Sequence, residues 1–299
     1  MQQAIPLIFD RQKIRKHQDK ANFISINDLF DWSTSEFIER LLLVKRDFNI
    51  IAEVGCQRDY LYEALSAQCA RGRHHAIERY IQLSFSQRGL ITTTGRTKGP
   101  HVITIQADEE YIPLKQRSVD LILGHLTWHF INDLPGFLKQ LNEILKPNGF
   151  MLSMLFGEKT LQELASVFFT TQMETWGGVT PFVAPMITPH QAGNLLVRAC
   201  FTLPVVDRHT LQIHYTSLWQ LLKDIQAFAG QSSLYANHRV LTRGFLRKAE
   251  ENYKKMFATN EGKLIVTLDF LFLSGWSYHS SQQKALKPHH AAKRLIEVL

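Results

Sequence analysis

The stretch Asn49-Ile50-Ile51-Ala52-Glu53-Val54-Gly55-Cys56-Gln57-Arg58-Asp59-Tyr60-Leu61 indicates how the whole chain is organised. An apolar run ends at an acidic residue and a glycine. After a short connection, a helical pattern follows through Tyr62, Leu65 and Ala70. A strand, a tight turn and a helix in this order are typical of the first unit of a nucleotide-binding α/β sheet.

The turn itself departs from the usual pattern of such sheets. Glycines are expected at positions 55, 57 and 59, but Gln57 and Asp59 occupy the last two. Glycine lets the backbone approach a ligand closely, so Gln57 adds bulk and Asp59 adds a negative charge. At an effective dielectric of ~20, like charges ~4–5 Å apart repel by roughly 3–4 kcal/mol. Two interpretations stay open: cofactor binding is weakened or altered, or a rearranged loop retains it.

Composition restricts the classes of partner. The 299 residues carry a formal charge of +7, but Lys and Arg are scattered. Their one modest cluster, Arg11–Lys16, is interpreted as a solvated helix face, so no nucleic-acid partner is predicted. No apolar run approaches the ~20 residues of a membrane span, so no integral membrane segment is predicted. Three unpatterned cysteines favour a reducing compartment.

The rest of the chain extends this unit into an α/β domain. Residues 1–48 predict an N-terminal helical cap, and residues 49–299 one domain with a lid inserted at about 157–200 and 216–258. Five strands joined by crossover helices imply a parallel, doubly wound sheet. The predicted strands are 49–54, 74–78, 102–106, 118–123 and 150–155, with later ones at 211–215 and 264–273. The predicted helices after residue 130 are 134–145, 160–171, 189–199, 217–228 and 241–257, and 177–185 is a predicted loop.

Several motifs, taken in order, resemble the class I S-adenosylmethionine-dependent methyltransferases. They are Glu53-Val54-Gly55-Cys56, Glu78, Asp108-Glu109-Glu110, Asp120-Leu121-Ile122 and Leu145-Lys146-Pro147-x-Gly149. The resemblance implies a Rossmann-like, seven-stranded sheet and S-adenosyl-L-methionine as cofactor. The replacements at Gln57 and Asp59 count against cofactor binding.

Other stretches resemble one family within this superfamily, the NADH:ubiquinone oxidoreductase complex assembly factor 5 family. They are Phe9-Asp10-Arg11, His129-Phe130-Ile131-Asn132-Asp133-Leu134-Pro135, Phe156-Gly157 and Gly275-Trp276-x-Tyr278-His279-x-Ser281-Gln282. The resemblance covers about residues 8 to 285. It implies a protein substrate, namely an arginine in a respiratory complex I subunit that becomes hydroxylated during assembly.

Cofactor contacts are expected at Glu53, Gly55, Gln57, Glu78, Asp108 and Glu109. Glu78 lies 23 residues beyond Gly55, close to the spacing of a carboxylate that binds ribose hydroxyls, although a solvated glutamate fits equally well. The resemblance assigns Asp108 to the adenine amine, for which a carboxylate is a suitable acceptor.

Substrate contacts are expected from aromatic residues, but no catalytic base is assigned. The pocket candidates are His129, Trp128, Trp276 and His279. His129 and Trp128 follow the fourth strand, where open α/β sheets bind ligands, whereas Trp276 and His279 fit core packing better than a pocket. His125 and His129 are four residues apart, but His125 follows a strand, so no metal site is predicted.

Two rivals to the hydroxylase remain, so enzymatic activity itself is an open question. One is a conventional methyltransferase, of the malonyl-carrier-protein type or with an unknown substrate. The other is a non-catalytic assembly chaperone that has lost its cofactor. Only eight residues precede Phe9-Asp10-Arg11, too few for a transit peptide. A bacterial cytoplasmic protein, at most peripheral to the inner membrane, is therefore expected rather than a mitochondrial matrix protein.

Overall fold

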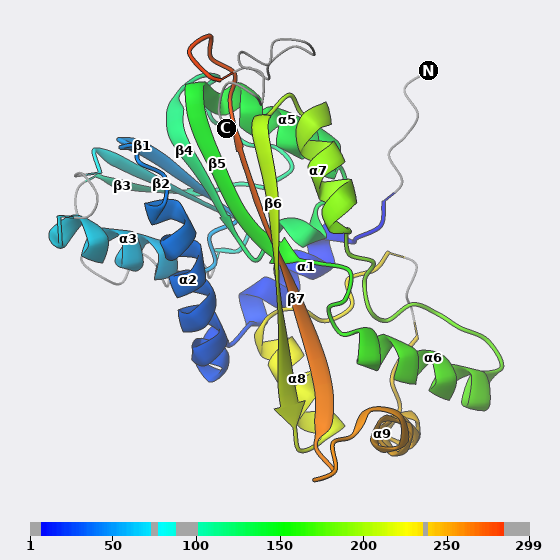
Figure 1. Ribbon diagram of the computed structural model, residues 1–299. Helices are drawn as coiled ribbons and strands as arrows, with labels where there is room; N and C mark the ends of the chain where they lie inside the picture. Colours follow the sequence, from blue (N-terminus) through cyan, green and yellow to red (C-terminus); the bar gives the residue numbers. More distant parts are fainter. Residues whose placement is uncertain (1–6, 73–76, 88–100, 236–238, 284–299) are drawn as a thin grey trace, which may run out of the picture.

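The computed structural model describes residues 7–72, 77–87, 101–235 and 239–283. Its strands form one sheet in the order β3-β2-β1-β4-β5-β7-β6 (Figure 1). Strands β1 to β5 pair in parallel, whereas β7 runs antiparallel to both β5 and β6. The expected seven-stranded α/β fold is thus confirmed. The strands are β1 (Ile50–Val54), β2 (Arg79–Ser84), β3 (Val102–Gln106), β4 (Val119–His125), β5 (Leu145–Phe156), β6 (Thr202–Tyr215) and β7 (Leu264–Trp276).

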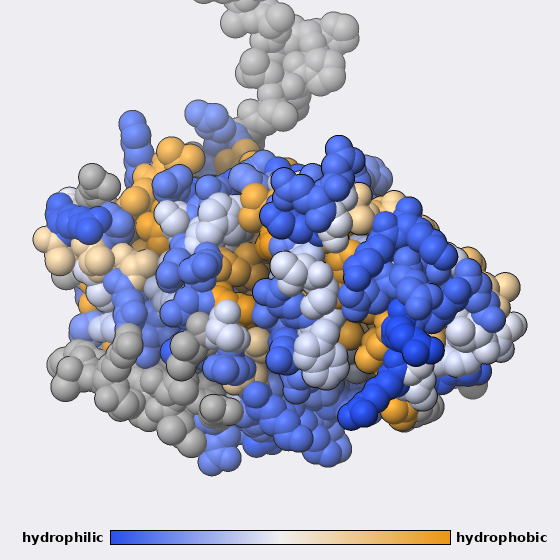
Figure 2. Space-filling view, turned by 90° about the horizontal axis from the view of Figure 1, so that it is seen from below, coloured by the Kyte–Doolittle hydropathy of each residue, from blue (hydrophilic) through white to orange (hydrophobic). Residues whose placement is uncertain are grey.

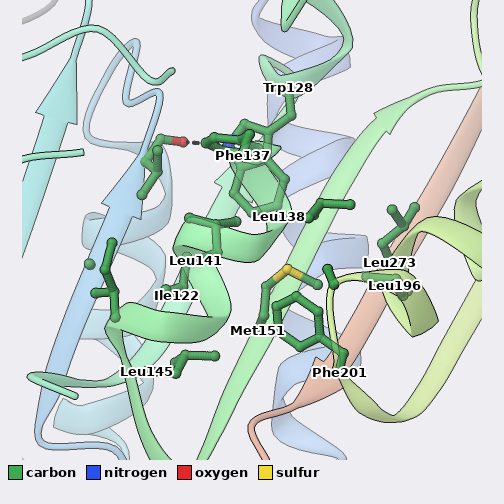
Figure 3. Packing of buried hydrophobic residues seen from close by; sticks show 14 of the residues in the cluster. Ile122, Trp128, Phe137, Leu138, Leu141, Leu145, Met151, Leu196, Phe201 and Leu273 are labelled. Carbon is green, nitrogen blue, oxygen red and sulfur yellow. Dashed lines mark hydrogen bonds between the residues drawn. The ribbon is translucent and has the colours of Figure 1, made fainter. Parts of the chain in front are cut away.

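One face of the sheet is covered by α5 (Leu134–Ile144) and α7 (Pro189–Arg198). Helix α5 begins where the Asp133 side chain accepts a hydrogen bond from the amide of Gly136, a standard N-cap. From α5, Leu138 and Leu141 pack on Ile122 of β4 and Met151 of β5 (Figure 3). Helix α7 belongs to this layer through Leu196, although its residues fall within the predicted lid.

The other face is covered by α2 (Asn27–Leu42) and α3 (Tyr60–Ala70). Phe37 of α2 and Leu61 of α3 lie in the same cluster as Leu121 and Leu123 of β4. Because successive residues of a strand point to opposite faces, Leu121 and Leu123 pack here while Ile122 packs under α5. This explains the unbroken apolar run of β4, as predicted for a strand buried on both faces.

The lid is built on an extension of the sheet. The ladder between β5 and β7 ends at Phe156 and Phe270, while β6 and β7 continue pairing as far as Tyr215 and Leu264. Helices α6 (Gln162–Trp176), α8 (Leu218–Ala227) and α9 (Arg243–Phe257) share one apolar cluster with this extension. They lie at the bottom of Figure 1, and the predicted loop 177–185 follows α6.

The N-terminal cap consists of α1 (Arg11–Lys20), a 3-10 turn at Phe23–Ile26, and α2. The cap is mainly helical, as predicted, and Asp10 caps α1 by accepting from the amide of Lys13. Among the described residues, no helix is both long and apolar enough to cross a membrane.

The predicted strand at 74–78 lies mostly outside the described residues, and its described part, Ile77 and Glu78, is not in a strand. Residues 73–76 lie outside the described residues, and the strand that pairs with β1 begins only at Arg79. Gln82 interrupts the apolar pattern of β2, yet it is completely buried because its amide binds a carboxylate. A strand with a buried polar residue is easily missed, because the prediction relies on the regular spacing of apolar residues.

Candidate functional site

The loop that follows β1 lies at the carboxyl edge of the sheet, where open α/β sheets bind ligands. Gly55 has φ +83°, and a methyl group added there would lie 2.2 Å from Oγ1 of Thr127. Only glycine fits this conformation and this approach. On the neighbouring strand β4, the chain turns at Leu126, whose φ of +57° is uncommon for a side-chain-bearing residue. These two turns bring residues 55–59 and 127–130 together.

Asp59 points into the protein rather than toward a ligand. It is 8% exposed, and its carboxylate accepts a hydrogen bond of 2.9 Å from Nε2 of Gln82. Beneath it, Glu53 accepts from the Tyr80 hydroxyl at 2.9 Å. Burial raises the pKa of Glu53 to about 7, against the opposing effect of its hydrogen bonds to Tyr80, Gln82 and Cys56. The sequence predicted that the charge of Asp59 would repel the cofactor. Because Asp59 faces Gln82 in the interior, that repulsion is no longer expected.

Buried polar atoms without a hydrogen-bond partner gather at this edge. Among the described residues, they include Oε1 of Gln57, Oγ1 of Thr127 and Nδ1 of His129. Unsatisfied buried polar atoms are rare in folded proteins, and each one calls for a bound ligand or water. Together with the glycine turn at Gly55, the unpaired atoms of Gln57 and Thr127 fit a polar nucleoside cofactor at the ends of β1 and β4.

The acidic loop after β3 is held by the N-terminal cap. Arg11 of α1 forms ion pairs with Asp108, at 2.5 Å, and with Glu109. Its guanidinium also lies 4.5 Å from the ring centre of Phe85, which follows β2. Burial raises the pKa of Glu109, while Arg11 opposes that rise. The interpretation of Arg11–Lys16 as a solvated face is therefore wrong for Arg11, because its partners lie almost a hundred residues away in sequence.

Asn132 joins three of the family motifs at this loop. Its side-chain oxygen accepts from the amides of Ile8 and Phe9 at 2.9 and 2.8 Å. Its own amide donates to Oε1 of Glu110 at 2.8 Å. Asn132 thus ties the Phe9-Asp10-Arg11 segment to the acidic loop, and the resemblance in sequence corresponds to contact in space.

Glu78 does not lie with these residues, so the predicted meeting of Glu78 with the glycine loop is wrong. Its amide donates to the Asn49 carbonyl, and its carboxylate accepts from the Asn49 side chain at 2.9 Å. Since β1 and β2 run in parallel from Ile50 and Arg79, Glu78 lies at the amino edge of the sheet, opposite Gly55. The carboxyl end of β2 carries Ser84 instead.

The aromatic candidates separate into three environments. Trp128 is a core residue, 1% exposed, that donates from Nε1 to the Val54 carbonyl at 3.0 Å (Figure 3). Trp276 and His279 lie at the amino edge, because Trp276 pairs with Phe150 at the start of the apolar part of β5. The Trp276 ring packs 4.5 Å from that of Phe150. The fourth candidate, His129, is among the residues that line a cavity.

That cavity, of about 490 Å³, lies between the lid and the carboxyl edge. His129 is 8% exposed, and burial lowers the pKa of its imidazole to about 3, so the ring is neutral. Farther into the lid, the cavity is lined by Tyr215 and Asp224. Sequence reasoning missed both, because neither stands near a recognisable motif. Among the described residues, no group of three or more His, Cys, Asp or Glu is placed to hold a metal ion.

Comparison with known proteins gives a consistent result. Residues 52–153 match the family model of a methyltransferase domain. The mitochondrial arginine-hydroxylase NDUFAF5 of Danio rerio is 30% identical over 284 residues, covering 94% of this chain and 86% of the relative. The human protein of the same name is 29% identical and covers 93% and 79%. The malonyl-[acyl-carrier protein] O-methyltransferase of Methylovorus sp. (strain MP688) is 26% identical over 90% of both chains.

Among solved structures, a putative methyltransferase from Bacillus halodurans C-125 superposes with a TM-score of 0.55 at 10% identity. The match covers 82% of this chain and 99% of that one. At such low identity the likeness concerns the fold alone, which is that of the class I methyltransferases.

Proposed function

The chain belongs to the NDUFAF5 arginine-hydroxylase family, and we propose that it hydroxylates an arginine side chain of a protein substrate. The observation that carries this proposal is the extent of the match, which covers 94% of the chain and so includes the cap and lid as well as the sheet. We further propose that the substrate is a subunit of respiratory complex I. Hydroxylation replaces a C–H bond with C–OH and takes one oxygen atom from O₂; the other oxygen atom leaves as water, which requires two protons and two electrons from an external reductant.

The charge at the carboxyl edge supports a cationic substrate. Although the whole chain has a formal charge of +7, this edge is rich in carboxylates. They belong to Asp108 and Glu110, which are partly exposed, and to Glu53, Asp59 and Glu109, which are buried. Arg11 pairs with Asp108 and Glu109 and offsets part of this charge. A concentrated field of one sign at a cleft raises the local concentration of ligands of the opposite sign. An arginine-bearing segment is attracted to such an edge.

We propose that S-adenosyl-L-methionine is the cofactor, held by Gly55, Gln57 and Asp108. The close backbone approach at Gly55 and the unpaired Oε1 of Gln57 support this assignment. Asp108 uses Oδ1 for both Arg11 and the amide of Glu110, which leaves Oδ2 for an adenine amine. Bound there, the cofactor would supply a sulfonium centre with an electrophilic methyl group.

Methyl transfer is the second candidate function. The methyltransferase-domain match at residues 52–153 and the relative that methylates malonyl-carrier protein favour it. In this reading, His129 is a neutral imidazole beside the acceptor. Because burial lowers its pKa to about 3, it would orient the acceptor by a hydrogen bond and not take its proton. Orientation of the acceptor against the methyl group would supply most of the catalysis.

One experiment separates these possibilities. Cells lacking the gene are complemented with the wild-type chain or with Gly55→Ala, and the arginines of complex I subunits are examined by mass spectrometry. One added oxygen atom that depends on Gly55 supports hydroxylation, and one added methylene supports methylation. No modification, with complex I assembled normally by both chains, would leave only the chaperone.

Gly72→Ala is the matched control for that experiment. Gly72 has φ +69°, so alanine there meets the same backbone strain as alanine at Gly55, where φ is +83°. No heavy atom lies within 4 Å of the added methyl group at Gly72, whereas Thr127 blocks it at Gly55. A loss seen with both variants would report strain and not the cofactor loop.

A further inference from the structure

The cavity beside His129 is elongated and mainly apolar. It runs from His129 and Phe156 at the sheet edge to Tyr215 in the lid. Phe156 stands level with Phe270, and Tyr215 stands level with Leu264, six residues farther along β7. At about 3.3 Å per residue, the two ends are roughly 20 Å apart. Its walls include Leu164, Phe168 and Leu221 of the lid helices.

His129 and Tyr215 mark the two ends of this cavity. Other polar residues line it as well, among them Gln231, whose Oε1 also has no hydrogen-bond partner among the described residues. At the sheet end, His129 is more than nine-tenths buried, and its Nδ1 has no partner among the described residues. Its ring touches Phe156, with the centroids 5.0 Å apart. At the lid end, the Tyr215 hydroxyl is hydrogen-bonded to the carboxylate of Asp224. A neutral imidazole supplies one N–H donor and one acceptor, and no charge.

We propose that this cavity binds an elongated, uncharged apolar molecule of the fatty-acyl class, whose single carbonyl or hydroxyl oxygen hydrogen-bonds to His129. The apolar walls match a hydrocarbon chain, and the unpaired imidazole nitrogen matches one polar head group. This site is distinct from the proposed cofactor loop, because Gly55, Gln57 and Asp59 do not line the cavity.

A guanidinium group fits the interior poorly. Of the two carboxylates that line the cavity, Asp224 is already bonded to Tyr215, and Asp28 is exposed at the rim. A cation placed at His129 would meet a neutral ring and apolar walls, and burying an unpaired charge is costly. The substrate arginine is therefore expected at the acidic edge and not in this cavity.

The lid side of the surface is consistent with entry of an apolar chain from solvent. Viewed from below, hydrophobic residues are visible in recesses between ridges that are largely hydrophilic (Figure 2). Burial of a hydrocarbon chain is favourable roughly in proportion to the apolar area removed from water. A chain that fills the cavity can therefore bind without any charged contact.

The test uses the purified full-length chain and the neutral fluorescent probe Nile red, with dodecanol as displacing ligand. We expect saturable binding with one site per chain and displacement by dodecanol at micromolar concentration. Dodecanoate should displace at least tenfold less effectively at neutral pH, because its carboxylate must be buried. An arginine-containing peptide should not displace the probe.

Two adjacent phenylalanines of α6 provide a matched pair of variants. Phe168 lines the cavity and is 3% exposed, whereas Phe169 is 55% exposed. Phe168→Trp should weaken dodecanol binding at least tenfold, and Phe169→Trp should leave it unchanged. His129→Phe keeps the ring contact with Phe156 and removes both nitrogens. This variant should bind dodecanol about tenfold more weakly. It replaces Phe168→Trp as the test if that variant does not fold.

Three results would overturn the proposal. They are absence of saturable probe binding by folded protein, equal weakening by the two tryptophan variants, and displacement of the probe by the arginine peptide. The last would make the cavity the peptide site. None of these results bears on whether complex I arginines gain oxygen, so the proposed function stands or falls separately.

Discussion

The contact between Arg11 and the acidic loop allows the loss of stability on its removal to be estimated from the burial of the two partners. We expect Arg11→Met to destabilise the protein strongly, because Glu109 is only 4% exposed and would keep an uncompensated charge. Removing one partner of a buried ion pair typically costs about 3–5 kcal/mol. The Arg11 side chain is itself 16% exposed, so we take the lower end, about 3 kcal/mol. In thermal unfolding this corresponds to roughly 5–10 °C.

Arg15→Met is the matched control, because it makes the same chemical change four residues along the same helix. Arg15 is exposed, and its guanidinium lies 5.9 Å from the Phe85 ring centre. Substitution at an exposed site of this kind should lower the free energy of unfolding by no more than about 0.5 kcal/mol. Equal melting temperatures for the two variants would refute the reasoning, since Arg11 would then be no more than a surface arginine.

The pH dependence of the Arg11 variant gives an independent check. Burial raises the pKa of Glu109 and Arg11 lowers it, so the variant should have a still higher folded-state pKa. A raised carboxyl pKa means that stability is present below the unfolded-state pKa and is lost as pH rises through the folded-state pKa. The gap between wild type and Arg11→Met should therefore widen from acidic to alkaline pH. A constant gap would exclude Glu109 as the cause.

Three further perturbations test other parts of the site. Because burial raises the pKa of Glu53 to about 7, its favourable contribution to the free energy of unfolding should be lost between about pH 4.5 and pH 7. In urea unfolding, Glu53→Gln should lack this decrease of stability with pH. Asp59→Asn should change calorimetric S-adenosylmethionine affinity less than threefold, or about 0.65 kcal/mol, because the side chain faces Gln82; a tenfold gain would instead show that its charge opposes the cofactor. Gly275→Ala should cost about 1–3 kcal/mol, because the new methyl group would lie 2.9 Å from Phe201, while cofactor affinity stays unchanged.

Much of the fold follows from local patterns in the sequence. The strand predicted at 102–106 has those bounds in the structure, and the helix predicted at 134–145 ends one residue earlier. Both segments have apolar residues at the period of their own secondary structure. The strand β2 (Arg79–Ser84) was not predicted, because Gln82 interrupts its apolar pattern and is buried only through its contacts with the carboxylates of Glu53 and Asp59.

The site was less predictable, because its residues meet through long-range contacts. Arg11 lies in a run of charge whose local pattern indicates a solvated face, and nothing in that run reveals Asp108 as its partner. The spacing of Glu78 from Gly55 fits a ribose-binding carboxylate but cannot tell which edge of the sheet Glu78 occupies. His129 lies four residues beyond the carboxyl end of β4 and lines the cavity, while its contact with a substrate stays a prediction.

The C-terminal motif Gly275–Gln282 lies at the opposite edge of the sheet from the proposed cofactor loop. Gln282 accepts a hydrogen bond from Thr202 at 2.7 Å and donates to the Ser277 carbonyl at 2.8 Å, at the amino edge of the sheet. The motif therefore fastens residues 277–282 to β6 and records a shared architecture. A descendant that had lost every catalytic group could keep this ending intact. During evolution, a protein can therefore remain a recognisable member of the family after it has lost the family's activity.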